Sequence, residues 1–144
     1  MINDIISGIT NGIYQEFGSG YKIYTENIEQ GLTEPCFFIA VLEAQQTRII
    51  GNRYMLTAVL DVHYFPATKA KNKEMQEAAQ RLHSILQRIT LLDGDMLNGF
   101  DLNWETVEDV LHFFVSYKPT VKYQQAAEEA MAEVTVAATT KGGE

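Results

Sequence analysis

The sequence predicts a single α+β domain, in which two main helices pack on a mainly antiparallel sheet of about four to five strands. The first observation is periodicity. Apolar residues recur every three or four positions in two segments, as in amphipathic helices, and every second position in others, as in strands. The second is the order of these segments, which contains too few strand-helix-strand units for a wound parallel sheet. The third is the length of 144 residues, which is that of one ordinary domain.

The N-terminal segment is predicted to be a helix that ends at Gly18-Ser19-Gly20. Gly8 and Gly12 each weaken a helix by about 1 kcal/mol relative to alanine, so packing must stabilise this segment. Small residues also permit close docking, here against a sheet or a neighbouring subunit. The predicted contact stripe consists of Ile2, Ile5, Ile6, Ile9, Ile13 and Phe17.

Two strands and a long connection follow. Residues 21–24 form a short predicted strand, and residues 25–34 are polar and acidic with no periodicity of their own. Loops of this length without regular structure are uncommon and often make functional contacts. Residues 35–42 are apolar on both alternating faces, which predicts a central strand that is covered on two sides.

The next two elements have the clearest patterns. Gly51-Asn52 marks a turn, and residues 53–65 alternate in hydropathy up to Pro66, which predicts a strand. The period then changes to that of a helix, with Asn72 as the expected N-cap and Glu74 in the first turn. The apolar face of the strand should consist of Tyr54, Leu56, Ala58, Leu60, Val62 and Tyr64, and that of the helix of Met75, Ala78, Ala79, Leu82, Ile85, Leu86 and Ile89.

A hairpin and a tail complete the chain. Turns are expected at residues 93–95 and near residues 108–109, and the segments that follow them should form an antiparallel hairpin that Pro119 ends. We predict one domain over residues 1–123, followed by an acidic, alanine-rich tail over residues 124–144 that is mobile unless a partner orders it. One face of the first hairpin strand should consist of Met96, Phe100, Leu102 and Trp104.

Charge and segment type argue against several classes of protein. The net charge is −8 and the pI is near 4.8, whereas nucleic-acid binding needs clustered lysine and arginine. The only basic cluster, Lys69, Lys71 and Lys73, is expected to be a solvated connection. The N-terminus lacks the features of a signal peptide, and no apolar run approaches the roughly 18 residues of a membrane span. We therefore expect assembly in the cytoplasm and no membrane partner.

No motif indicates an enzyme. The sequence contains no nucleophile elbow, zinc-protease helix or phosphate-binding loop. Cys36 lies in an apolar run, so we expect a buried thiol with a raised pKa. Asp61 and His63 share one strand face and could hold a metal with His112 or Asp101, although such polar pairs are ordinary on a less buried face. We predict no catalytic residue, metal or cofactor. A small metal-dependent enzyme that uses Asp61, His63 and His112 is kept as an alternative.

Five segments carry a resemblance that covers nearly all of residues 1–123. They are Glu16-Phe17-Gly18 with Tyr21-Lys22-Ile23-Tyr24, residues 29–39 (EQGLTEPCFFI), Gly51-Asn52-Arg53-Tyr54, Tyr64-Phe65-Pro66, and residues 110–117 (VLHFFVSY). In this order and spacing they resemble the tail terminator family of contractile-tailed phages and phage-tail-like particles of Gram-positive bacteria.

The resemblance implies a structural subunit of the virion tail and not an enzyme. Six copies would close into a ring that caps the tail tube, stops growth of the tube and sheath, and presents a surface for the head connector. DNA would pass through the ring without specific binding, which an acidic protein favours because it repels phosphate. The alternative is another head-tail joining or tube-associated phage structural protein.

A ring requires heterologous contacts, in which one patch meets a different patch on the next copy. We expect the acidic connection of one subunit to face basic residues of its neighbour, and such rim charges select the partner and the register more than they add affinity. The candidate interface residues are Glu26, Glu29 and Glu34 on the acidic side, and Arg48, Arg53, Lys69, Lys71 and Lys73 on the basic side.

Overall fold

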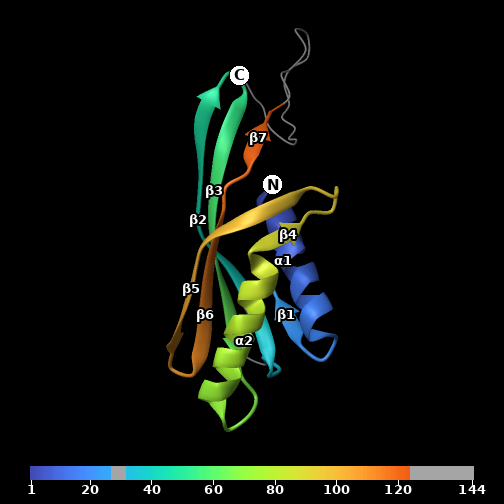
Figure 1. Cartoon of the computed structure of the whole chain (residues 1–144), viewed down its shortest axis with the longest axis vertical. Helices are drawn as coiled ribbons and strands as arrows, with labels where there is room; N and C mark the ends of the chain where they lie inside the picture. The colour runs from blue at the N-terminus through green and yellow to red at the C-terminus, as the bar shows by residue number, and fades with distance from the viewer. Residues whose placement is uncertain (27–31, 124–144) are drawn as a thin grey trace.

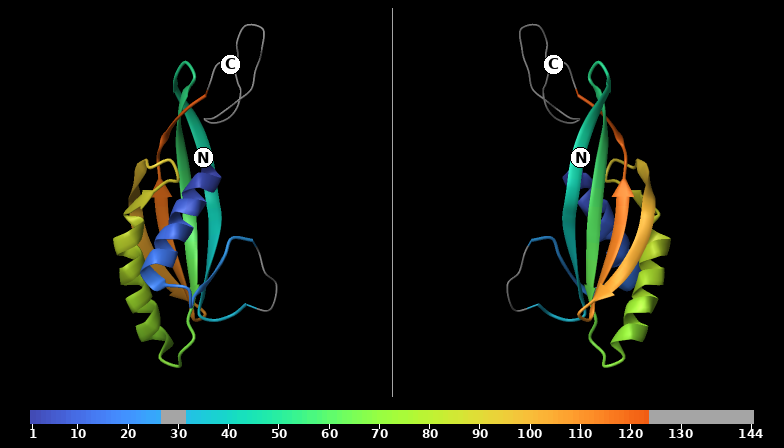
Figure 2. Two further views of the ribbon diagram at one scale, coloured as in Figure 1. Left: turned by 90° about the vertical axis from the view of Figure 1, so that its right-hand side faces the viewer. Right: turned by 90° about the vertical axis from the view of Figure 1, so that its left-hand side faces the viewer.

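The chain forms a long curled sheet with two helices on one of its faces (Figures 1 and 2). The computed structural model describes residues 1–26 and 32–123, and strands make up 48% of the structure. Within these ranges, seven strands form one mixed sheet that curls into half a barrel. The predicted α+β fold with a mainly antiparallel sheet of four to five strands is therefore wrong, because the protein is mostly β and its sheet is larger. The predicted tail, residues 124–144, lies outside the described residues.

The strands pair in an order that brings the middle of the chain to the centre of the sheet. They are β1 (Lys22–Tyr24), β2 (Cys36–Ile50), β3 (Arg53–Phe65), β4 (Arg88–Thr90), β5 (Met96–Val107), β6 (Val110–Tyr117) and β7 (Thr120–Lys122). Their order is β1-β2-β3-β6-β5-β4, and β7 pairs with β3 outside this path. The β1–β2 pair is parallel and the other pairs are antiparallel.

The additional strand residues lie where hydrophobic alternation is absent. Strand β2 was expected to end at Leu42, but it continues for eight residues to Ile50 as the partner of β3. Every residue from 41 to 50 is exposed, so this part of β2 has no core face and its sequence shows no period of two. Pro119 does not end the sheet, because β7 follows it and pairs with the first residues of β3. Backbone pairing, rather than burial, specifies these segments.

Both predicted helices are confirmed as α1 (Ile2–Phe17) and α2 (Lys71–Leu86), but Ile89, which was expected on the apolar face of the second helix, lies in β4. The predicted N-cap of α2 is wrong, since Ala70 occupies that position and Asn72 lies inside the helix. Glu74, in the first turn, instead holds the segment that leads into the helix. Its carboxylate accepts hydrogen bonds from the backbone N–H groups of Ala67 (3.0 Å) and Thr68 (2.9 Å), from the Thr68 hydroxyl (2.6 Å) and from the Tyr64 hydroxyl.

The core lies between the two helices and the sheet face that they cover. The predicted α1 stripe is confirmed at Ile5, Ile9 and Ile13, which are completely buried. Burial of each such side chain contributes about 1.5–3 kcal/mol. Gly8 permits the close docking expected of it, because a Cβ atom there would lie 3.1 Å from the Thr90 carbonyl oxygen. The sheet contributes the buried side chains of Phe37, Ile39, Leu56, Leu60, Val62, Tyr64, Leu111, Phe113, Val115 and Tyr117.

A bulge in β5 changes which of its residues face the helices. The pairing with β6 shifts register between Phe100 and Asn103. Leu102 and Trp104 pack against the core, whereas Phe100 is 44% exposed and Met96 is 61% exposed. The prediction that these four apolar residues share one face is therefore wrong, since an extra residue in a bulge reverses the alternation.

Candidate interaction surfaces

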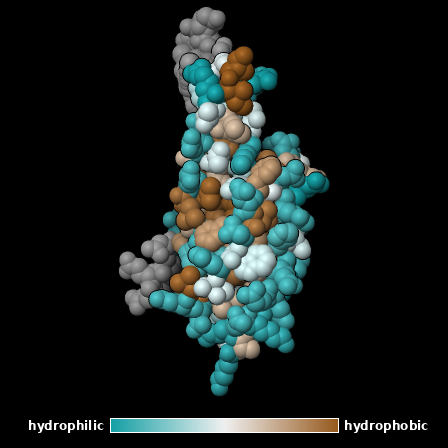
Figure 3. All heavy atoms as spheres, turned by 60° about the vertical axis from the view of Figure 1, so that its left-hand side comes forward, coloured by the Kyte–Doolittle hydropathy of each residue, from teal (hydrophilic) through white to brown (hydrophobic). Residues whose placement is uncertain are grey.

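The outer part of the β2–β3 hairpin projects beyond the helices, as Figures 1 and 2 show. We call residues 43–57 the arm. Its turn is preceded by two apolar residues, Ile49 (54% exposed) and Ile50 (69% exposed). Figure 3 shows hydrophobic atoms at this end of the molecule. Adjacent apolar side chains at the end of a projection are a typical contact feature, because burying them against a partner removes them from water.

The last described segment braces the arm near its turn. Strand β7 pairs with Arg53–Met55, and the rings of Tyr54 and Tyr123 meet edge to face at 5.5 Å. The Tyr123 hydroxyl donates a hydrogen bond to the Gln46 side chain (2.8 Å), and the Asn52 side-chain amide donates to the Tyr123 carbonyl. The arm is therefore a braced element rather than an isolated hairpin.

The second surface is the face of the sheet that the helices leave open, which we call the outer face. Figure 3 shows that hydrophobic atoms gather in its middle. The register places Phe38, His63 and His112 in one row across β2, β3 and β6, and Ala40, Asp61 and Phe114 in the next row. Within the described ranges, no helix covers this face (Figure 2).

Asp61 is the most buried residue of these two rows, with an exposed fraction of 5%. Its Oδ2 atom lies 2.8 Å from His63 Nε2 and 3.0 Å from His112 Nδ1. Its Oδ1 atom is buried and has no hydrogen-bond partner among the residues that the structure describes. The structure thus brings together three of the four residues that spacing suggested for a metal site. Asp101, the fourth, is exposed in the β5 bulge and lies outside this group.

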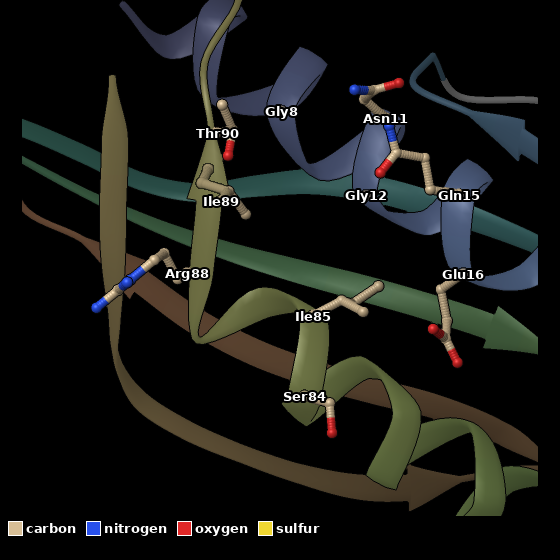
Figure 4. Close-up of a pocket in the computed structure, with 10 residues that line it drawn as sticks. All are labelled: Gly8, Asn11, Gly12, Gln15, Glu16, Ser84, Ile85, Arg88, Ile89 and Thr90. Atoms are coloured by element: carbon tan, nitrogen blue, oxygen red, sulfur yellow. The ribbon is translucent and has the colours of Figure 1, made fainter. Parts of the chain in front are cut away.

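A groove of about 600 Å³ lies between α1, α2 and β4 (Figure 4). Its titratable side chains are Glu16 and Arg88. Glu16 is already engaged, because Arg81 donates hydrogen bonds to its carboxylate (3.0 Å) and to its carbonyl (2.9 Å). The lining therefore offers no nucleophile paired with a base. It consists of Gly8, Asn11, Gly12, Gln15, Glu16, Ser84, Ile85, Arg88, Ile89 and Thr90.

Cys36 is completely buried, as predicted, and is no candidate nucleophile. Burial, with a smaller contribution from the negative charge of Glu34, raises the pKa of its thiol to about 11. The thiolate required for nucleophilic attack is therefore scarce near neutral pH.

The predicted interface charges are distributed over the long axis of the molecule. Glu26 and Glu34 are exposed on the β1–β2 connection, whereas Arg48 and Arg53 are exposed on the arm, near the opposite end (Figures 1 and 2). Arg48 donates a hydrogen bond to the Gly51 carbonyl (2.7 Å) and lies over the Tyr54 ring. Glu29 lies outside the described residues. Lys69, Lys71 and Lys73 lie at the start of α2, with Lys71 half-buried and the other two exposed. Their role in an interface remains a prediction.

The arm is the feature that sequence analysis missed. The available signal was the sequence Ile49-Ile50-Gly51-Asn52, in which two apolar residues directly precede a turn. An expected strand that stopped at Leu42 left these isoleucines without a structural context. Among the described residues, no helix is long and apolar enough to cross a membrane.

Comparison with known proteins identifies the chain's relatives. A family model described as "Phage tail terminator protein" matches residues 4–129, which is most of the chain. No curated protein matches the chain significantly.

Proposed function

As this chain belongs to the phage tail terminator family, whose members are structural components of the virion tail, we propose that it forms a ring on the end of the tail tube. The ring stops polymerisation of the tube and sheath and presents a surface for joining the head. The ring contains six copies, and the particle is a contractile-tailed phage or a phage-tail-like particle of a Gram-positive host. The number of copies, the type of tail and the host follow from the resemblance of the sequence to this family.

The braced arm is the observation that carries this proposal. A ring needs one patch that meets a different patch on the next copy. The turn end of the arm, with the exposed Ile49 and Ile50, lies beyond the helices of its own chain, so these side chains reach a neighbour more readily than their own core. The apolar middle of the outer face is the receiving patch that we assign to the neighbouring copy. A stable contact of this kind buries about 1,600 Å² in total.

Charge supports the same arrangement. The exposed carboxylates of Glu26 and Glu34 are separated from Arg48 and Arg53 along the length of one subunit (Figure 1). If these opposite charges pair, they pair between copies, and this head-to-tail complementarity is what a heterologous contact requires. Glu29 would add to the acidic side, and Lys69, Lys71 and Lys73 are the second basic group available to a neighbour.

The first test removes the apolar end of the arm. We expect the double variant Ile49→Ser with Ile50→Ser to abolish ring formation on purified tubes and to give tails of abnormal, uneven length in electron micrographs. The matched control is Leu92→Ser, which changes another apolar residue that is 82% exposed but belongs to the β4–β5 connection. Rings and uniform tails in the double variant would refute the role of the arm. Uniform tails in particles that lack the protein altogether would refute the terminator function itself.

The second test concerns the partners. Purified tube protein and purified head connector are offered separately to the wild-type protein. We expect capture of tube protein, with the sheath and the connector as further contacts of the assembled ring. Capture of the connector alone would favour the alternative function, a head-tail joining protein.

The lumen of the ring must pass DNA without binding it. A net charge of −8 suits this task, because phosphate repulsion prevents trapping. We expect acidic or neutral residues to line the bore, and a lysine-lined bore in a structure of the assembled ring would contradict this expectation.

A further inference from the structure

We propose that Asp61, His63 and His112 bind a divalent transition-metal ion on the outer face, with Zn²⁺ as the representative ion. The site is independent of the proposed ring function and assigns no catalysis to the protein. It uses one carboxylate oxygen and two imidazole nitrogens as ligands, with solvent in the remaining position.

The backbone fixes the three side chains close together. Asp61 and His63 are two residues apart on β3 and therefore point to the same face. His112, on the neighbouring strand β6, is paired directly with His63. Both strands lie in the middle of the sheet, where neighbours on each side restrict their movement. Directly paired residues have Cβ atoms about 4.5–5.5 Å apart, a spacing at which two imidazoles can share one ion.

The distances suit a metal after a small expansion. The three candidate ligand atoms all lie within 4.8 Å of one another. Asp61 Oδ2 is 2.8 Å from His63 Nε2 and 3.0 Å from His112 Nδ1. Ligand atoms placed tetrahedrally at about 2.0–2.1 Å from zinc are roughly 3.3 Å apart. The two distances from Asp61 Oδ2 would lengthen by a few tenths of an ångström, and rotation of the imidazoles would bring their nitrogen atoms, which lie within 4.8 Å of each other, to the same spacing.

Charge and burial provide the independent reason for a cation. Only 7% of the Asp61 side chain is exposed, and its Oδ1 atom has no hydrogen-bond partner within the described part of the chain. Burying a carboxylate is costly unless its charge is compensated. In the structure as described, its polar partners are the two histidines, and no lysine or arginine pairs with it. A divalent ion would supply the missing positive charge.

The surroundings hold the ligands and leave a path for the ion. His63 lies against the Phe38 ring at 5.3 Å, and His112 stacks on the Phe114 ring at 6.4 Å. These contacts limit the rotation of both imidazoles. The side chains of His63 and His112 are 20% and 23% exposed, so the group is reached from solvent on one side. Two imidazoles with one carboxylate select a transition metal over Mg²⁺ or Ca²⁺, which prefer all-oxygen ligands.

The test uses the full chain without a polyhistidine tag, stripped with a chelator and titrated calorimetrically with ZnCl₂. We expect one zinc ion per chain, a higher melting temperature with zinc, and visible absorption typical of low-coordinate cobalt when CoCl₂ replaces zinc. Asp61→Asn and His112→Gln should each lower the zinc affinity by about tenfold or more. Loss of a residue that only supports a ligand already lowers metal affinity by about tenfold, and loss of a ligand should lower it at least as much.

The chain offers a matched control, because it contains three histidines and His83 is exposed on α2, away from the site. His83→Gln should retain wild-type zinc affinity and cobalt absorption. Circular dichroism of each variant without metal shows whether it is folded, and His63→Gln replaces any variant that is not. Absence of stoichiometric binding to the wild type, or equal affinity in folded Asp61→Asn and His83→Gln, would overturn the proposal.

Discussion

The carboxylate of Glu74 is predicted to make folding stability depend on acid pH. Burial alone would raise its pKa, but the hydrogen bonds from Thr68, Tyr64 and Ala67 outweigh this effect and lower the pKa from 4.5 to about 2. A group with a lowered pKa in the folded state stabilises the protein above its unfolded pKa. That stability is lost as the pH falls from about 4.5 towards 2.

The size of this effect follows from the pKa shift. A pKa difference of one corresponds to about 1.4 kcal/mol, so lowering the pKa from 4.5 to about 2 has an upper limit of about 3.5 kcal/mol. Glu74 is only partly buried, and solvent screening reduces the expected contribution to about 1–2 kcal/mol. Replacement of Glu74 by glutamine removes the charge but retains the shape, so Glu74→Gln should cost this amount at neutral pH.

Urea denaturation of the wild type and Glu74→Gln at pH 7 and at pH 3 measures the effect. The difference in unfolding free energy should be about 1–2 kcal/mol at pH 7 and should shrink at pH 3, because the carboxylate of the unfolded chain is then protonated while that of the folded protein stays mostly ionised. Glu77→Gln, an exposed change three residues later on α2, is the control and should show little difference at either pH. An equal difference for Glu74→Gln at both pH values, or none at pH 7, would refute the reasoning.

Three further predictions concern the core. Gly99→Ala should destabilise the fold by about 1–3 kcal/mol in urea denaturation, because the new Cβ atom would lie 2.6 Å from the Leu86 carbonyl oxygen and 2.9 Å from Val115 Cγ2. An unchanged midpoint would show that β5 moves away freely. Tyr117→Phe should cost about 1–2 kcal/mol in the same assay, since the buried hydroxyl donates a 2.7 Å hydrogen bond to the Leu86 carbonyl. Cys36, with its pKa raised to about 11, should react with a thiol reagent at pH 8 far more slowly in the native protein than in urea, and equal rates would contradict its burial.

The predictable parts of the fold are those in which one regular period runs through a segment that is buried on one side. Strand β3 buries every second residue from Leu56 to Tyr64 on the predicted face, and Asp61 is the one residue of its other face that is also buried. The stripes of α1 and α2 are equally continuous, and both helices were found. Local sequence was sufficient here because each segment has one buried face and one period.

The parts that could not be predicted depend on pairing between distant segments. The bulge between Phe100 and Asn103 reverses the faces of β5, and nothing in the local hydropathy marks it. The arm residues of β2 are specified by hydrogen bonds to β3 and carry no apolar period. The same holds for the metal ligands. Spacing placed Asp61 beside His63, but only the β3–β6 register selects His112 over Asp101 as their partner.

The end of the arm and the metal ligands lie in separate regions of one sheet, so the two proposals can fail independently, although the ligands lie on the outer face that is assigned to receive a neighbour's arm. The arm turn pairs Ile50 with Arg53, and Asp61 lies eight residues further along β3, which corresponds to about 26 Å at the usual strand rise. Substitutions that far apart and without shared partners act additively on stability. Zinc affinity of a single chain should therefore survive loss of the isoleucines, whereas Asp61→Asn should leave the arm turn intact. Coupling between them can arise only in the assembled ring, where an arm seated on a neighbour's outer face would cover His63 and His112. Zinc binding that weakens or strengthens on assembly in the wild type, but not with Ile49→Ser and Ile50→Ser, would place the arm on that face.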